Sequence, residues 1–266
     1  MSQAQVTRRA PDARQIIDAA IDHAATHGLH SLTMRDLAQA VGKSTTVIVN
    51  LFGAKSGLIQ AVGEEALRRD TDFHSRFFGS VAGLPLSRDS LLTLARHNLR
   101  LRISDDAGFA RIWEALLIDS DIAPDSRNLV QRWTAMRKAA WRDYLSADAR
   151  LADFGDHLVE WATIEQFYAG ALQDRIDYDL IAAEGLGGLM DRAFDRPDGP
   201  ATATFWYREN LVLPRAPAAE LEPGSIQLRL LDIAADQILA RGISALTNRS
   251  VSAVAGTSTS TLAYHW

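Results

Sequence analysis

The sequence predicts an all-α protein. Three observations carry this prediction: apolar residues recur at spacings of three and four along most of the chain, alternating polar and apolar runs are few, and glycine or proline residues interrupt the periodic stretches. A chain of 266 residues, 47% of them hydrophobic, is long enough to bury a sizeable core. We therefore expect one or two helical units.

The first expected elements lie in residues 15–52. Gly28 stands where a left-handed residue would end a first helix, and Thr33 is placed to cap a short second helix, "MRDLAQA". Gly42 then breaks the chain, and Ser44 begins a third helix, "TTVIVNLF". This order of elements is typical of a helix-turn-helix. The inner stripe of the first helix comprises Ile16, Ile17, Ala20, Ile21 and Ala24, and that of the second comprises Leu37 and Ala38.

Residues 32–62, "LTMRDLAQAVGKSTTVIVNLFGAKSGLIQAV", resemble the DNA-binding domain of TetR-type transcriptional regulators. The resemblance implies that the third helix reads DNA. Two residues depart from the family pattern, because Val49 and Leu51 stand where the family usually has Tyr and His or Tyr, which tend to reach the DNA backbone. We therefore expect a weaker grip on phosphate.

The polar residues of this segment fit the same role. Thr45, Thr46 and Asn50 are short enough to contact base edges in the major groove, whereas basic side chains neutralise phosphates. The alternative is that the two threonines only begin a helix and that Asn50 is a solvated surface residue. The predicted DNA-binding residues are Thr33, Arg35, Lys43, Ser44, Thr45, Thr46, Asn50 and Lys55, with Arg8, Arg9 and Arg14 as a basic arm.

The C-terminal segment repeats the N-terminal one. Residues 229–266 align without a gap with residues 15–52, at a constant offset of 214 (242 − 28). Two copies separated by different sequence indicate a duplication rather than a solenoid. Identical pairs include Asp18/Asp232, Ala20/Ala234, Asp22/Asp236, Gly28/Gly242, Leu32/Leu246, Thr33/Thr247, Arg35/Arg249, Gly42/Gly256, Ser44/Ser258 and Thr45/Thr259.

This second copy is a truncated TetR-like helix-turn-helix by resemblance, and its role is open between a DNA reader, a packed domain and an unordered remnant. It contains no lysine, which disfavours DNA reading, whereas His265 and the polar run from Ser258 to Ser260 favour it. We expect it to fold and to pack against the rest of the chain or a partner subunit. The residues expected to face inward are Leu230, Leu231, Ala234, Ile238, Leu246, Val251, Val254, Leu262 and Trp266.

The middle of the chain loosely resembles the regulatory domain of the same family, which implies ligand sensing and homodimerisation. We expect four parts: the DNA-binding domain (1–60), a ligand-binding and dimerisation domain (61–196), a proline-rich linker (197–224) and the second copy (225–266). Phe205, Trp206 and Tyr207 predict that the linker lies against the body. The aromatic residues that could line a cavity, or simply fill the core, are Trp113, Trp133, Trp141, Trp161, Phe167 and Tyr168.

Composition narrows the remaining classes. The chain has no cysteine, which excludes disulfides, thiolate zinc sites and cysteine nucleophiles. The segment before residue 15 lacks an apolar signal-peptide core, and no run of about 18 apolar residues occurs, so we expect a cytoplasmic protein without membrane contact. The net charge of −5 divides into +2 for residues 1–60 (six basic, four acidic), −8 for 61–224 (19 and 27) and +1 for 225–266 (three and two).

Sites for chemistry are weak in this sequence. His157 and Glu160, and likewise His23 and His27, have spacings compatible with a metal site, but solvated helix faces explain them as well. The run "GLGG" at 185–188 lacks the lysine of a phosphate loop and is interpreted as a helix interruption. We expect no enzyme, catalytic residue, metal or cofactor.

The resulting expectation is a homodimeric repressor that binds a double-stranded DNA operator and is released by a small, apolar or aromatic effector. The alternative is a protein-interaction module derived from such a regulator, with weakened DNA binding. Val49, Leu51 and the acidic net charge are the features that favour this alternative.

Overall fold

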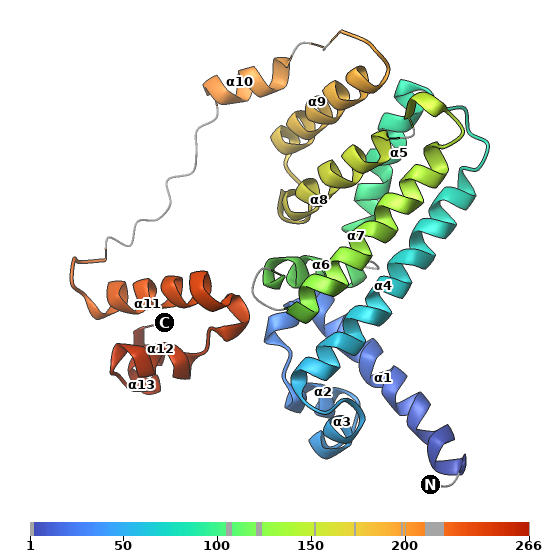
Figure 1. The fold of residues 1–266 in the computed structure, drawn as a ribbon. Helices are drawn as coiled ribbons and strands as arrows, with labels where there is room; N and C mark the ends of the chain where they lie inside the picture. The colour runs from blue at the N-terminus through green and yellow to red at the C-terminus, as the bar shows by residue number, and fades with distance from the viewer. Residues whose placement is uncertain are drawn as a thin grey trace.

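The computed structural model describes residues 3–104, 108–120, 124–151, 153–172, 174–197, 199, 201–210 and 221–265, with side chains from residue 13 onward except that of Ser244. Every regular element in these ranges is a helix (Figure 1), which confirms the all-α prediction. The α-helices are α1 (Gln3–His27), α2 (Met34–Ala40), α3 (Thr45–Phe52), α4 (Lys55–Ser80), α5 (Arg88–Arg102), α6 (Gly108–Asp119), α7 (Pro124–Leu145), α8 (Phe154–Leu172), α9 (Ile176–Ala193), α10 (Thr202–Asn210), α11 (Ile226–Arg241), α12 (Asn248–Ala255) and α13 (Thr259–His265). Single 3-10 turns, η1 (Leu29–Ser31), η2 (Ala149–Leu151) and η3 (Ile243–Ala245), join some of them.

The first three helices begin and end where capping chemistry places them. Gly28, with a φ of 81°, follows α1, and Thr33 caps α2 by accepting a hydrogen bond from the backbone N–H of Asp36. Gly42 also has a positive φ of 64°, and Ser44 is the N-cap residue of α3. These positions were all predicted. The stripe of α1 is confirmed as well, since Ile16, Ile21, Ala20 and Ala24 are buried and Ile17 packs against them.

A single hydrophobic core runs through α1, α2, α3, α4, α6 and α7. Leu58, Val62 and Ala66 of α4 are fully buried in it, together with Trp113 of α6 and Trp133 of α7. The expected boundary at residue 60 therefore falls inside a continuous helix and a continuous core. Periodicity alone could not separate α4 into two parts, because the helix has one apolar stripe along its whole length.

A second core joins α5, α7, α8 and α9 around Trp141, Leu158 and Met190. Helix α9 continues through residues 185–188 without a break, so the interpretation of this run as a helix interruption was wrong. Leu186 is fully buried there, and a Cβ on Gly187 would lie 3.5 Å from Arg88 Nη2. Packing of α9 against α5 thus outweighs the roughly 1 kcal/mol that each glycine costs a helix.

Part of the expected linker is helical. The N-terminus of α10 is held by α9, because the backbone N–H groups of Ala203 and Thr204 donate to the carboxylate of Glu184, the latter at 2.9 Å. The expectation that this segment lies against the body is confirmed for α10, which contacts α9, but Phe205 and Trp206 do not hold it there, since they are 53% and 57% exposed. A carboxylate that caps a helix makes the contact instead.

The last three helices form their own small core, consisting of Leu230, Val251 and Ala255 with partly buried neighbours. Three residues expected to face inward do not: Leu231, Ile238 and Val254 are 43%, 37% and 63% exposed. In the first copy, Ile17 and Ala24, the equivalents of Leu231 and Ile238, pack in a core to which α4 and α6 also contribute. Ala40, the equivalent of Val254, is itself exposed. Trp266 and the stretch 211–220 lie outside the described residues.

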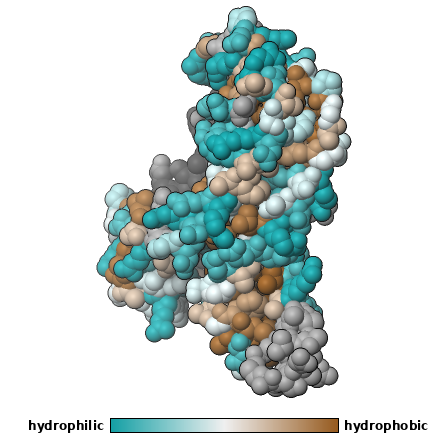
Figure 2. All heavy atoms as spheres, turned by 45° about the vertical axis from the view of Figure 1, so that its right-hand side comes forward, coloured by the Kyte–Doolittle hydropathy of each residue, from teal (hydrophilic) through white to brown (hydrophobic). Residues whose placement is uncertain are grey.

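The surface drawn in Figure 2 mixes hydrophilic and hydrophobic residues. In the described part of the chain, no single helix has the length and apolar character needed to span a membrane. The bent pair Thr45–Phe52 and Lys55–Ser80, which meet at 70°, satisfies that criterion by length and composition only.

Candidate nucleic-acid interface

Helix α3 has one packed side and one open side. Ile48 is fully buried and Leu51 packs against the first core, whereas Thr45, Thr46 and Asn50 are exposed. Successive residues of a helix are 100° apart, so positions 46 and 50 lie about 160° from Ile48, and positions 45 and 49 lie about 60° and about 100° from it, next to position 46. The core therefore holds α3 so that its short polar side chains face away from the protein.

The basic residues around α3 are also exposed to solvent. Arg35, Lys43 and Lys55 are all exposed, as is Arg14 on α1. Lys55 Nζ lies 3.5 Å from the carbonyl oxygen of His30, so this lysine also contacts η1. The expected basic arm is helical, because Arg8, Arg9 and Arg14 all lie within α1; the side chains of Arg8 and Arg9 lie outside the described residues.

The N-cap residues of α2 and α3, Thr33 and Ser44, differ in their hydrogen bonds. The Thr33 hydroxyl is engaged on both sides, because it accepts from the Asp36 N–H at 3.1 Å and donates to the Asp36 carboxylate at 2.6 Å. Ser44 makes no such side-chain bond to α3. Both side chains are exposed. The Thr33 hydroxyl bonds a backbone N–H group of α2, whereas the Ser44 hydroxyl bonds none of the first N–H groups of α3.

The two departures from the family pattern are not equivalent in the structure. Val49 is 49% exposed and lies between the polar residues of the open side. Leu51 is half-buried and packs against the first core. Only Val49 therefore presents an apolar group on the candidate DNA-facing side.

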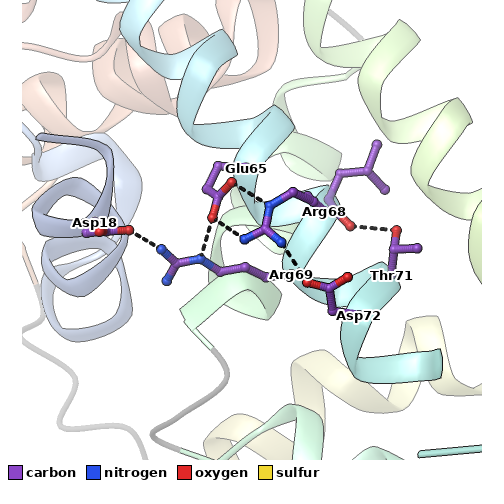
Figure 3. Close-up of polar contacts among 7 residues, drawn as sticks. Asp18, Glu65, Arg68, Arg69, Thr71 and Asp72 are labelled. Carbon is purple, nitrogen blue, oxygen red and sulfur yellow. Dashed lines mark hydrogen bonds and ion pairs between the residues drawn. The ribbon is translucent and has the colours of Figure 1, made fainter. Parts of the chain in front are cut away.

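Ion pairs fix α1 against α4 behind the candidate interface (Figure 3). Arg69 of α4 reaches Asp18 of α1 and also donates to Glu65, one turn earlier on its own helix, at 3.0 Å. Arg68 donates to Glu65 at 2.7 and 2.8 Å and to Asp72 at 2.6 Å. Sequence reasoning missed this network, although the spacing of three and four among Glu65, Arg68, Arg69 and Asp72 was a usable signal.

The network predicts a pH-dependent contribution to stability. Hydrogen bonds from Arg68 and then Arg69 outweigh burial and lower the pKa of Glu65 from 4.5 to about 2. A folded-state pKa below the unfolded one stabilises the fold above about pH 4.5, and this stabilisation is lost as the pH falls toward 2. We expect Glu65→Gln to destabilise the protein at pH 7 and the difference from wild type to shrink between pH 4.5 and 2.

Urea denaturation at pH 7, 4.5 and 3 measures this effect. Glu209→Gln, on an exposed residue of α10, is the control and should leave the denaturation midpoint unchanged throughout. A Glu65→Gln deficit that stayed constant across these pH values would contradict the assigned role of the ion pairs.

The six aromatic residues proposed for a ligand cavity do not gather in one place. Trp113 and Trp133 are buried in the first core, with Phe167 packed against it, whereas Trp141 is buried in the second core. Trp161 lines a cavity of about 250 Å³ between α5, α8 and α9. Tyr168 is 55% exposed.

Helices α8 and α9 expose apolar side chains on the body. On α8, Ile164 is 59% exposed, and Tyr168, four residues further on, is exposed as well. Ile176, the first residue of α9, is 69% exposed. Leu180 and Ile181 of α9 add two further exposed side chains. A contiguous apolar surface on these helices would fit a protein contact.

The spacings considered for metal binding serve other contacts. His157 Nδ1 lies 3.7 Å from Glu160, but Lys138 donates to Glu160 at 2.9 Å. The ring of His23 stacks on that of His27, with centroids 4.8 Å apart, and His23 also contacts the Ser31 hydroxyl at 2.9 Å. Across the described ranges, no three His, Asp or Glu side chains are grouped so that they could hold a metal ion.

Comparison with known proteins identifies the N-terminal part. Residues 16–62 match the family model described as bacterial regulatory proteins, tetR family. This segment is a TetR-type DNA-binding domain. The matched residues begin at the stripe of α1 and include all of α2 and α3 and the first turns of α4.

A solved structure shares the fold of a longer part of the chain. It comes from Mesorhizobium loti MAFF303099 and is described as a TetR-family transcriptional regulator. The two are 16% identical, with a TM-score of 0.53 over 71% of this chain and 97% of the other. At this identity the likeness shows the fold. No curated protein matched the sequence.

Proposed function

We propose that the protein is a homodimeric TetR-type regulator that binds an operator in double-stranded DNA and is released from it by a small molecule, most simply as a repressor. The observation that carries the proposal is α3, whose buried Ile48 directs Thr45, Thr46 and Asn50 outward. Threonine can contact base edges and thymine methyl groups, and asparagine can bond adenine through two hydrogen bonds. The exposed cations Arg35, Lys43 and Lys55 can neutralise phosphates beside it.

The first prediction separates the two copies. The triple variant Thr45→Ala, Thr46→Ala and Asn50→Ala is expected to lose operator affinity, by about 1–3 kcal/mol for each good base contact removed. The matched control alters the equivalent positions of the second copy, with Thr259→Ala, Ser260→Ala and Tyr264→Ala, and should bind as wild type does.

A duplex enriched by the wild-type protein from a random library provides the operator for this test. Fluorescence anisotropy at two or more salt concentrations measures affinity and its salt dependence. Equal binding by the wild type and the α3 variant would contradict the assignment. A wild-type protein that enriched no sequence would favour the alternative, a protein-interaction module in which the apolar Val49 side chain weakens DNA binding.

The exposed apolar residues of α8 and α9 support dimerisation. Ile164, Ile176 and Leu180 would be covered in a dimer that packs these helices against their copies. Two DNA-binding domains held at a fixed separation can then occupy half-sites about 34–36 Å apart. Sedimentation equilibrium tests this part of the proposal, which a monomer at micromolar concentration would refute.

The shared core supports a response of DNA binding to a ligand in the body. Helix α6 packs closely on α1, since a Cβ on Gly108 would lie 3.1 Å from Ile21 Cγ2 and 3.3 Å from Ala25 Cβ. A ligand that displaces α6 thus changes the contact that positions α1, and with it α2 and α3. Such a ligand shifts the equilibrium only by its difference in affinity for the two arrangements.

We also propose that α11, α12 and α13 are a second TetR-like helix-turn-helix with a structural or interaction role. Supporting it, Gly242 and Gly256 have φ values of 77° and 65°, close to those of their equivalents Gly28 and Gly42. Thr247 caps α12 as Thr33 caps α2, by accepting from a backbone N–H three residues on. The second-copy variant described above is its test, since a changed operator preference would make it a DNA reader.

A further inference from the structure

Three helices of the body each place a pair of polar residues, four positions apart, in the interior. The pairs are Asp70 and His74 on α4, Asn98 and Arg102 on α5, and Trp133 and Arg137 on α7. Residues four apart lie on the same face of a helix. All six side chains are at most 2% exposed. They form, with Trp113 of α6, what we call the buried polar cluster.

One oxygen of the Asp70 carboxylate has two hydrogen-bond partners in the cluster. Asp70 Oδ2 accepts from Arg137 Nε at 2.6 Å and from Trp133 Nε1 at 2.5 Å, and Asp70 Oδ1 lies 3.0 Å from His74 Nδ1. Burial alone would raise the pKa of Asp70, but the charges of Arg137 and the hydrogen bond and charge of His74 hold it well below its ordinary value. Asp70 Oδ2 is therefore fully engaged, whereas Oδ1 has no hydrogen-bond partner, because His74 Nδ1 bonds the backbone carbonyl of Asp70 at 2.9 Å.

The donors of the cluster are not satisfied. Within the described residues, Arg137 Nη1 and Nη2, Arg102 Nε, Asn98 Nδ2 and Trp113 Nε1 have no hydrogen-bond partner, although each is buried. The Asn98 carbonyl oxygen is also without a partner, and so is His74 Nε2. Buried polar groups are normally paired, since leaving one unpaired costs free energy. Donors thus outnumber free acceptors in this part of the core.

Two buried guanidinium groups accompany these donors. Burial, and then the charge of Arg137, lowers the pKa of Arg102 to about 9. One terminal nitrogen of Arg102 bonds Gln166, and Gln166 donates in turn to Glu114 at 2.8 Å. The Arg137 guanidinium lies over the Trp113 ring, with its central carbon 4.3 Å from the ring centroid. The carboxylates of Asp70 and Glu114 lie near both guanidinium groups, so the site combines paired charges, free donors and apolar ring surface.

We propose that the buried polar cluster binds the carboxylate of a small organic acid, and that this acid is the effector. The inference deepens the proposed function and rests on it. A carboxylate is an acceptor-only group, and two parallel hydrogen bonds from one guanidinium fit its geometry. The Trp113 ring offers an apolar surface to the rest of the acid.

The cluster also has a connection to the outside and to the DNA-binding helices. Arg102 lines a cavity of about 420 Å³ whose wall includes Ala25 and Thr26 of α1 and Gly108 and Arg111 of α6. An acid that enters there meets Arg111 and then Arg102. Its binding would alter the contact of α6 with α1, on which the proposed release of DNA depends.

The test compares acids with their uncharged amides on the full-length protein. The probes are phenylacetate, benzoate and octanoate, each beside phenylacetamide, benzamide and octanamide. We expect at least one acid to raise Tm, by about 5 °C at roughly 100 times its Kd, and to release DNA in the anisotropy assay, while its amide does neither. Equal responses to an acid and its amide, or no response to any acid, would overturn the proposal.

Variants that remove one unpaired group locate the site without breaking the Asp70 ion pair. Asn98→Leu should fold with Tm unchanged or higher, and Trp113→Phe should fold with a lower Tm, because a smaller ring leaves a cavity in the core. Both should weaken acid binding at least tenfold. The matched control is Tyr144→Phe, which removes a buried, unpaired hydroxyl near the second core and should bind the acid as wild type does. Wild-type acid affinity in both cluster variants would overturn the proposed site.

Failure of this inference differs from failure of the proposed function. Should a neutral compound from a broader library release DNA while no acid does, ligand response stands and the carboxylate site is refuted. Loss of operator binding by the α3 variant can be measured without any effector. The DNA-binding proposal is therefore decided independently of the acid.

Discussion

Asp70→Ala is expected to lower the free energy of unfolding by about 3–5 kcal/mol, because it leaves buried cations without their carboxylate. Arg137 and Trp133 lose their shared acceptor, and bulk solvent does not reach them, since both side chains are at most 1% exposed. Urea denaturation at pH 7, followed by tryptophan fluorescence, measures the loss. In wild type the same stabilisation should disappear as the pH falls below 3.8, the ordinary pKa of the carboxyl, because its folded-state pKa lies lower.

The control for this prediction is Asp72→Ala, two residues further along α4. Its side chain is 50% exposed and pairs with Arg68 at the surface, where ion pairs contribute about 0–1 kcal/mol. A similar cost for the two variants would show that the interior ion pair is not a large term.

Ile48→Ala should cost about 2–5 kcal/mol, the range for removing a large buried aliphatic side chain. Ile48 is fully buried and lies in the core that joins α3 to α1, α2 and α4. Thermal or urea denaturation measures the loss, and we expect operator binding to weaken at temperatures where the wild type is intact, because α3 is held by this residue.

Leu262→Ala, at the equivalent position of the second copy, is the matched control. Leu262 is only partly buried against a core of three residues, so less packing is lost. An Ile48→Ala variant as mildly affected as Leu262→Ala would mean that α3 does not depend on the shared core.

The ends of the first helices could be predicted because each is decided locally. Gly28 and Gly42 supply backbone conformations that other residues adopt at a cost. Thr33 caps α2 through its hydroxyl, and Ser44 occupies the N-cap position of α3. The exposure of Thr45, Thr46 and Asn50 followed from the apolar stripe on the other side of α3. These inferences need only the neighbouring residues.

The buried polar cluster could not be predicted in the same way. In a sequence, two polar residues four positions apart on a helix are normally interpreted as part of its solvent-facing side. The helices of Asp70, Asn98 and Arg137 also have apolar stripes, which would be expected to face the core instead. Only the approach of α4, α5 and α7 shows that these faces turn toward one another. The aromatic prediction was incomplete for the same reason, since Trp113 and Trp141 belong to different cores.

Burial in the second copy was overpredicted because a repeat conserves pattern but not neighbours. Ile238 is equivalent to Ala24, which is 1% exposed, yet Ile238 is 37% exposed. In the first copy α6 and α4 contact α1, whereas α11 contacts η3 and α12 most extensively and reaches α13 through Gln227 and His265. An equivalent residue keeps its place in the helix but not the surface that covers it.

Helix α4 passes without interruption from the DNA-binding domain into the body, and this continuity sets a mechanical scale. Its 26 residues form a rod of about 39 Å at 1.5 Å per residue. A tilt of about 5° imposed at the body end would therefore move the Lys55 end by about 3 Å, close to the separation between adjacent base pairs. Small rearrangements deep in the body are thus large enough, at the other end of this rod, to put a side chain of α3 opposite the wrong base.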